Sequence, residues 1–350
     1  GTLRVNPQPF GYYTLINRVN VGGMAEVFKA CDDRENSQPA FAADPADVIQ
    51  SDPRPLALVD QMKDGPLKDH LLSCSDTPIR RTQFSIAHRG APLGFPEHTV
   101  EGYQAAARMG AGIVECDVTF TSDLELVCRP AQNDLHTTTN ILTTNLADTC
   151  IKPFQPARGD AKAAAECRTS EVTLEAFRNL IGKRDAADKS ASTPEAYQKS
   201  PVGHRLLQGE NDTGVLMSHR ETITLFKSLG VKFTPELKSP AVAMPFNGFS
   251  QQDYAQKLID EYKSAGIPAS DVWAQSFNLN DILYWIEQEP AFGAQAVYLD
   301  GRFSAGLDPN DPIEVNYREN FEGEPTGKEN LELLKMHPSH GHNSSIVNGI

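Results

Sequence analysis

Short apolar runs alternate with amphipathic stretches between residues 84 and 300. Apolar runs of strand length occupy residues 84–87, 112–120, 124–128, 231–237, 272–277 and 294–300. Hydrophobic residues recur at helical spacing over residues 99–109, 174–181, 220–229, 251–265 and 281–289. This alternation is typical of a parallel sheet with crossover helices. None of the runs is followed by the Gly-x-Gly-x-x-Gly turn of dinucleotide-binding folds, so the pattern favours an α/β barrel of the TIM type, (β/α)8.

The rest of the chain divides into parts of different composition. We predict an N-terminal appendage (1–31), a linker rich in Pro, Ala, Asp and Ser (32–56) and a helical lead-in (57–83) with a helix near 56–72. The barrel (84–303) follows, with a long insertion after its third strand (140–230). An atypical C-terminal tail (304–350) is acidic and loop-like over 304–328 and contains a short helix over 329–336. Only six strands are recognisable, so the barrel is predicted to lack its last two and to expose two unpaired edges.

Composition and charge restrict the classes of function. The chain has 350 residues, of which 39% are hydrophobic and 22% charged, enough for a large core. Its formal net charge is −14 and it has no basic run, which argues against a nucleic-acid partner. No apolar stretch approaches the roughly 18 residues of a membrane span, so no transmembrane segment is expected. A small anionic substrate stays possible, because one positive pocket can lie within a negative surface.

The six cysteines include no Cys-x-x-Cys pair, which disfavours a zinc ribbon. Cys116 and Cys128 lie in apolar strand-like runs, where we expect buried free thiols. Cys150 and Cys167 are 17 residues apart in a polar stretch, and the sequence leaves open whether they stay free or form a disulfide in an oxidising compartment. Such a bridge would contribute about 3 kcal/mol. The N-terminus lacks the pattern of a signal peptide.

Charged residues cluster where the predicted strands end. They are His88 and Arg89 after the first strand, Glu115 and Asp117 on the second, and Glu236 and Lys238 at the end of the fourth. Residues two apart on a strand share a face, and catalytic groups of TIM-type barrels lie at the carboxyl ends of strands. Three carboxylates pointing into one barrel mouth would repel unless a cation lay between them, and oxygen ligands favour Mg²⁺ or Ca²⁺ over zinc. The adjacent arginine and lysine suit a phosphate group.

Each of these pairs, taken singly, has an ordinary structural explanation. A lone histidine is usually a hydrogen-bonded structural residue, and acidic and basic residues at a strand end often form simple ion pairs. Their joint placement on successive strand ends is what favours a functional site.

Several motifs resemble the glycerophosphodiester phosphodiesterase family. They are Ala87–Thr99 (AHRGAPLGFPEHT), Gly110–Thr119 (GAGIVECDVT), Leu135–Thr139 (LHTTT), Phe233–Lys238 (FTPELK) and Gln275–Phe277 (QSF). They occur in the family's order over residues 84–300. The resemblance implies a (β/α)8 barrel that hydrolyses glycerophosphodiesters to glycerol 3-phosphate and an alcohol, a reaction of lipid metabolism, in the periplasm or outside the cell.

The resemblance also implies roles for single residues. Glu115, Asp117 and Glu236 would be the ligands of a divalent cation, Ca²⁺ or Mg²⁺. His88 would be one of two acid/base histidines. The substrate-binding residues would be Arg89, Lys238 and Glu97.

One position departs from the family pattern. Pro130 stands where the second histidine is expected, and proline can neither donate nor accept a proton. His136 follows six residues later, which we expect to be too far along to substitute. Because general acid–base help contributes about 10² to 10⁴ in rate, hydrolysis is expected to be slow by that factor. The alternative is a relative that binds phosphodiesters without turnover.

A second resemblance covers residues 10–30. Gly22, Gly23, Val27 and Phe28 match the glycine-rich start of a bacterial serine/threonine protein kinase. No Val-Ala-Ile-Lys, His-Arg-Asp or Asp-Phe-Gly motif follows, so the parts that hold ATP and magnesium are missing. An ATP-linked regulatory fragment is therefore a third hypothesis, and an appended β-hairpin or fusion remnant is the simpler interpretation.

Overall fold

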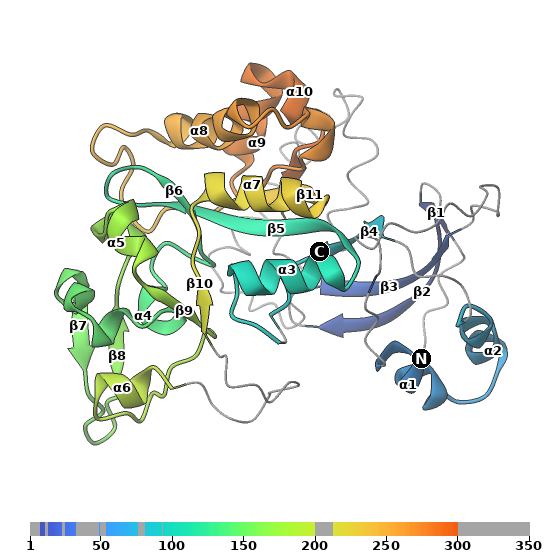
Figure 1. Ribbon diagram of the computed structural model, residues 1–350, viewed down its shortest axis with the longest axis horizontal. Coiled ribbons are helices and arrows are strands. Elements are labelled where there is room, and N and C mark those ends of the chain that lie inside the picture. Colours follow the sequence, from blue (N-terminus) through green and yellow to red (C-terminus); the bar gives the residue numbers. More distant parts are fainter. Residues whose placement is uncertain are drawn as a thin grey trace, which may run out of the picture. The chain divides into compact units, whose positions relative to one another are not determined.

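The computed structural model describes residues 8–10, 13–22, 25–32, 49, 54–75, 81–92, 94–199 and 213–299. The chain divides into two units, one of Gly1–Ala42 with Gln275–Ile350 and one of Ala43–Ala274. Figure 1 labels helices and strands of both units. Most of the predicted linker and the whole predicted tail lie outside the described residues.

The N-terminal residues form an antiparallel three-stranded sheet. Its strands are β1 (Gln8–Phe10), β2 (Tyr13–Gly22) and β3 (Ala25–Asp32), in the order β1-β2-β3. The paired strands β2 and β3 fit an appended hairpin. The turn between them, at residues 23–24, is outside the described residues, so the kinase resemblance stays a prediction.

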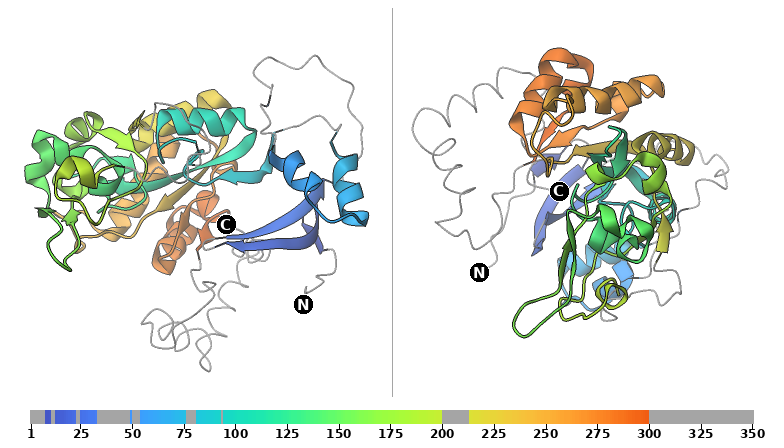
Figure 2. Two further views of the ribbon diagram at one scale, coloured as in Figure 1. Left: turned by 90° about the horizontal axis from the view of Figure 1, so that it is seen from below. Right: turned by 90° about the vertical axis from the view of Figure 1, so that its left-hand side faces the viewer.

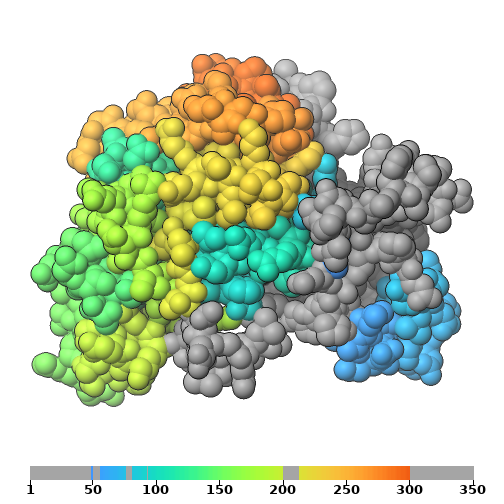
Figure 3. Space-filling model, viewed as in Figure 1, coloured from blue at the N-terminus to red at the C-terminus, as the bar shows by residue number. Residues whose placement is uncertain are grey.

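Three parallel strands form the centre of the larger unit. They are β4 (Thr82–Ala87), β5 (Ala111–Phe120) and β11 (Lys232–Leu237), with β5 between the other two. All ten residues of β5 are buried, as expected of a strand covered on both faces. The connections carry α3 (Val100–Arg108) and α7 (His219–Leu229), which pack side by side over β5 and lie together on the face seen in Figure 3. The predicted alternation of parallel strands and helices is confirmed here.

The predicted third parallel strand is wrong. β6 (Leu126–Cys128) turns back and pairs antiparallel with β5, with Val118 opposite Cys128. The connection over residues 121–125 is too short for a crossover helix, which a parallel partner would need. The return brings the end of β6 alongside the middle of β5, where Arg129 N donates to Asp117 O at 2.8 Å.

The same return corrects the prediction of free thiols in these strands. Cys116 on β5 and Cys128 on β6 form a disulfide, with their Cα atoms 5.4 Å apart. Cys150 and Cys167 form a second one, which settles the question that the sequence left open. Among the described residues, Cys74 is a free and exposed cysteine.

The predicted insertion forms a body with its own core between β6 and α7 (Figure 2). Its strands pair antiparallel, β7 (Lys152–Gln155) with β8 (Ala164–Glu166) and β9 (Ile181–Lys183) with β10 (Thr213–Val215). Its helices are α5 (Leu174–Arg178) and α6 (Pro194–Tyr197), with 3-10 turns at Ile141–Thr143, Asn145–Thr149 and Thr169–Glu171. The predicted bounds of 140–230 are shifted, because α4 (Leu135–Thr138) contributes to this core, whereas α7 packs over β5. Buried Leu135, Phe177 and Tyr197 belong to its core.

The remaining helices follow the predicted pattern with shifted ends. The helix predicted over 56–72 is two helices, α1 (Arg54–Asp60) and α2 (Pro66–Ser73), because Gly65 and Pro66 interrupt it. α8 (Gln251–Ser264) packs on α7, and a 3-10 turn covers Ala269–Asp271. In the smaller unit, β12 (Gln275–Ser276) and β13 (Val297–Tyr298) are parallel, and α9 (Leu279–Gln288) and α10 (Pro290–Gly293) connect them.

Two predictions concern what the chain lacks. The part of the chain after residue 299, where the last two strands were predicted to be missing, is outside the described residues. A search of the described helices finds none with the length and apolar character needed to cross a bilayer.

Candidate active site

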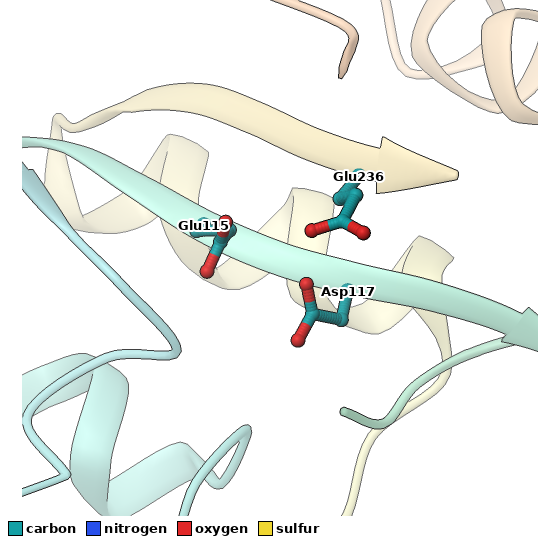
Figure 4. A group of neighbouring side chains, drawn as sticks. All are labelled: Glu115, Asp117 and Glu236. Atoms are coloured by element: carbon teal, nitrogen blue, oxygen red, sulfur yellow. The ribbon is translucent and has the colours of Figure 1, made fainter. Parts of the chain in front are cut away.

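Three carboxylates predicted as metal ligands lie together on neighbouring strands. Glu115 and Asp117 are on β5, and Glu236 is on β11 directly opposite Asp117 in the parallel register (Figure 4). One ligand oxygen of each lies within 4.8 Å of the others, and all three residues are buried. The spacing of two residues along β5 and the pairing of β5 with β11 produce this cluster, as the sequence pattern predicts.

The cluster holds more negative charge than its surroundings favour. Burial, followed by the charges of Asp117 and Glu236, raises the pKa of Glu115 well above its usual value. Burial and the charge of Asp117 raise the pKa of Glu236 to about 7. A cation between buried carboxylates that repel one another would stabilise their ionised forms.

Two basic side chains flank the carboxylates. Arg89 Nε lies 3.0 Å from Asp117 Oδ2, and its backbone N donates to Glu115 Oε2 at 3.0 Å. Lys238 Nζ lies 2.6 Å from Glu236 Oε1 and 3.8 Å from Asp117 Oδ1. The structure thus brings both predicted phosphate contacts to the cluster.

His88 and Glu97 complete the predicted set. His88 Nε2 lies 3.4 Å from Glu115 Oε2, and its side chain is 44% exposed, so an added molecule can reach it. Burial, and then the charge of Arg89, lowers the pKa of His88. Glu97 Oε2 pairs with Arg89 Nη1 at 3.2 Å and so holds the arginine through a different nitrogen from the one that faces Asp117.

The donor set fits a divalent cation. Asp117 is fully buried, yet its Oδ1 has no hydrogen-bond partner. A buried carboxylate oxygen left without a hydrogen bond is costly, and a metal ion is one of the partners that can compensate it. Three carboxylates with oxygen donors alone match the preferences of Ca²⁺ and Mg²⁺.

A second histidine at the cluster was missed by the sequence analysis. His98 is fully buried, and its Nε2 lies 3.0 Å from Asp117 Oδ2. Its Nδ1 lies 2.8 Å from the hydroxyl of Tyr103. Burial, and then the charge of Arg129, lowers its pKa well below 6.5. His98 stands inside the motif that carries the family resemblance, but a single histidine in a loop has no periodicity that would show where its ring points.

The positions expected to bear on a second acid/base group lie on and beyond β6. Pro130 follows Arg129, whose backbone N–H donates a hydrogen bond to Asp117 O, so the proline's backbone runs beside β5. His136 lies on α4, directly before the predicted insertion, and its ring stacks on Tyr197 of the insertion with centroids 6.4 Å apart. The charged groups that influence it most, Lys189, Glu166, Asp185 and Lys183, are all outside the carboxylate cluster.

These features define a class of site, in which strands of a parallel α/β sheet bring together three carboxylates, two basic side chains and an accessible histidine. The family model of the glycerophosphoryl diester phosphodiesterase family matches residues 88–296, which include every predicted site residue. The chain therefore belongs to this family. Membership confirms the predicted TIM-type α/β fold class, and the described parallel strands are part of such a barrel.

Two curated proteins are similar over part of the chain. A protein of Arthroderma benhamiae named "Extracellular protein" is 40% identical over 119 residues, which are 34% of this chain and 49% of that protein. A Mycobacterium tuberculosis protein named "Probable glycerophosphodiester phosphodiesterase 1" is 44% identical over 57 residues, which are 16% of this chain and 21% of that protein. The chain thus spans half the length, or less, of these relatives.

Solved structures of the family are also similar. One from Silicibacter pomeroyi, which carries the family's name, has a TM-score of 0.46 and 20% identity, and the similarity covers 66% of this chain and 70% of that one.

Proposed function

We propose that the chain hydrolyses glycerophosphodiesters to glycerol 3-phosphate and an alcohol, with a divalent cation held by Glu115, Asp117 and Glu236. The observation that carries the proposal is the convergence of three buried carboxylates within 4.8 Å of one another beside two basic side chains and an accessible histidine. Family membership supports the substrate class. The bound cation, Ca²⁺ or Mg²⁺, would supply charge neutralisation for the phosphoryl oxygens.

The chain's own side chains have separate tasks in this proposal. Arg89 and Lys238 orient the phosphate, and Glu97 fixes the arginine through their 3.2 Å ion pair. His88 has a lowered pKa, so its ring is neutral at pH 7 and can accept the proton of the attacking hydroxyl group. Departure of the alkoxide requires a proton from a second group or from water.

Pro130 supports a slow enzyme. We expect that Pro130→His, which supplies a second titratable group beside β5, raises the rate of glycerophosphocholine hydrolysis by about 10² to 10⁴. Pro130→Gln is the matched control, because it removes the proline ring without adding an acid or base. An equal change in both variants, or none in either, would contradict this explanation.

A non-catalytic binding relative is the second candidate, and Pro130 is the observation that favours it. The two are separated by incubating the protein with glycerophosphocholine in Ca²⁺, in Mg²⁺ and in EDTA, and measuring glycerol 3-phosphate. An enzyme releases product with the cation and loses that release in EDTA and in Glu115→Ala. A binding protein gains thermal stability from glycerol 3-phosphate plus cation and forms no product.

We also propose that the protein works in an oxidising compartment, outside the cell or in a periplasm. Two disulfides, Cys116–Cys128 and Cys150–Cys167, support this, since disulfides persist where thiols are not kept reduced. The similar Arthroderma benhamiae protein carries the name "Extracellular protein". Thiol titration of the native protein before and after reduction tests it: four additional thiols should appear on reduction if both bridges are present.

The predicted domain partition stands as a proposal too. We propose that residues 84–303 are the catalytic body and that the insertion supports its site loop. Arg184 of the insertion donates to Pro92 O at 3.0 Å, in the loop that begins at His88, and Val215 N donates to Glu101 Oε2 at 2.9 Å. Expression of residues 84–303 alone, followed by a cation titration, tests whether this part keeps the site.

A further inference from the structure

A buried hydrogen-bonded chain leads away from the proposed metal ligand Asp117. His98 joins its carboxylate to the hydroxyl of Tyr103, with distances of 3.0 Å and 2.8 Å. All three side chains are fully buried. We call His98, Tyr103 and Asp117 the site triad.

The hydrogen-bond roles within the site triad follow from its chemistry. An ionised carboxylate only accepts, so the ring nitrogen that faces it, Nε2, carries hydrogen. In a neutral ring Nδ1 then accepts, and the hydroxyl of Tyr103 donates to it. The tyrosine thereby selects the tautomer of His98 that holds Asp117.

The backbone fixes the same ring from a second direction. His98 has a φ of 55°, in the left-handed region, and its N–H donates to Arg89 O at 3.1 Å. Tyr103 lies on α3, whose N-cap Thr99 directly follows His98. The loop and the first turn of α3 therefore place the ring and its hydroxyl partner together.

The two carboxylate oxygens of Asp117 therefore differ: His98 and Arg89 contact one, and the other has no hydrogen bond. Oδ2 has His98 Nε2 and Arg89 Nε each at 3.0 Å, while Oδ1 has no hydrogen bond. We propose that His98 and Tyr103 are positioning residues that orient Asp117 for the cation. This inference rests on the proposed function, since it concerns the same metal ligand. Partners of this kind commonly change metal affinity 10- to 100-fold when they are removed.

The larger unit contains a matched control. His219 on α7 joins Glu261 Oε2 at 2.8 Å and the hydroxyl of Tyr262 at 3.2 Å, and all three are buried. We call these three residues the helix triad. It has the same chemistry between α7 and α8, and none of its members belongs to the carboxylate cluster.

The test is a titration of the full chain with Mn²⁺, in which the electron paramagnetic resonance signal measures the free Mn²⁺. Tyr103→Phe should weaken Mn²⁺ binding about 2- to 10-fold, the effect of one hydrogen bond. His98→Leu should weaken it about 10- to 100-fold, and His98→Gln, which keeps an N–H donor, should weaken it less. Tyr262→Phe should leave the affinity unchanged, and thermal unfolding of the metal-free variants reports on folding separately.

The outcomes distinguish this inference from the proposed function. Wild-type affinity in both Tyr103→Phe and His98→Leu, or an equal loss in Tyr103→Phe and Tyr262→Phe, overturns the positioning role and leaves the metal site standing. If His98→Leu does not fold, Tyr103→Phe decides alone, because its ring still packs against Phe226 at 4.7 Å. A wild-type chain that binds no Mn²⁺ overturns both.

Discussion

The site triad and the helix triad contain the same three groups, an imidazole, a phenol and a carboxylate, and both are buried. They differ at the second carboxylate oxygen. In the helix triad, Glu261 Oε1 accepts from Arg220 Nε at 3.1 Å, so both oxygens are satisfied. In the site triad, Asp117 Oδ1 has no hydrogen bond, and Lys238 Nζ approaches only to 3.8 Å.

We infer from this difference that the helix triad is a structural network and that the site triad is part of a ligand-binding one. A buried carboxylate with every oxygen paired joins two helices and stabilises the fold. A buried carboxylate with one oxygen left over, beside two further carboxylates, is costly until a cation arrives. Mutation of the site triad's cluster should therefore lower cation affinity with little effect on the free energy of unfolding. Mutation of the helix triad should lower the free energy of unfolding with little effect on cation affinity.

The largest expected effect comes from neutralising one acid in each region. Glu115→Gln should lower the rate of glycerophosphocholine hydrolysis by about 10³-fold, because a metal contributes several kcal/mol to the transition state. It should leave the metal-free protein as stable as the wild type or more so, since one of three repelling charges is removed. Steady-state kinetics and chemical denaturation measure the two quantities.

Glu261→Gln should do the reverse. It leaves buried His219 and exposed Arg220 without their charged partner, which should lower the free energy of unfolding by about 1–3 kcal/mol, the cost of a buried group that loses its hydrogen-bond partner. Cation affinity of the folded fraction should stay the same. A large loss of stability in Glu115→Gln would contradict the comparison.

Removal of the insertion's disulfide should separate stability from affinity in a third place. The double variant Cys150→Ala/Cys167→Ala opens a bridge between cysteines 17 residues apart, which should cost about 3 kcal/mol of unfolding free energy. Neither triad includes these residues, so Mn²⁺ affinity should not change. Chemical denaturation and the Mn²⁺ titration report the two effects, and a matching loss of affinity in the folded variant would contradict the independence of this bridge from the carboxylate cluster.

A smaller effect concerns a histidine that has no carboxylate partner of this kind. Burial, and then the charge of Lys189, lowers the pKa of His136 to about 4. The unfolded chain, with a histidine pKa near 6.5, then binds the proton more tightly, so this residue costs stability as the pH falls from about 6.5 to about 4. His136→Phe keeps the stacking on Tyr197 and should gain stability relative to the wild type over that interval.

Denaturation curves of both proteins at several pH values test this prediction. The difference between their unfolding free energies should be constant above about pH 7 and should change in favour of His136→Phe as the pH falls. A difference that is independent of pH would contradict the assignment.

The acidic cluster could be predicted from the sequence. Glu115 and Asp117 are two residues apart on β5 and so share a face, and the parallel pairing of β5 with β11 places Glu236 beside them. The antiparallel pairing of β6 with β5 was missed because an apolar run does not show in the sequence whether the strand will pair parallel or antiparallel. The disulfide of Cys116 and Cys128 was missed for the same reason, since only the antiparallel return brings them together. His98 was missed because its role depends on a left-handed loop conformation that periodicity does not report.

The central claim is that Glu115, Asp117 and Glu236 hold a divalent cation that hydrolysis requires. Anomalous diffraction from a crystal of the protein grown with Mn²⁺ tests it most directly, with activity measured on the same preparation. We predict a peak bounded by these three carboxylates that is absent in Glu115→Gln, and product release that stops in EDTA. Hydrolysis that persists in EDTA, with no peak at the cluster, would contradict the account.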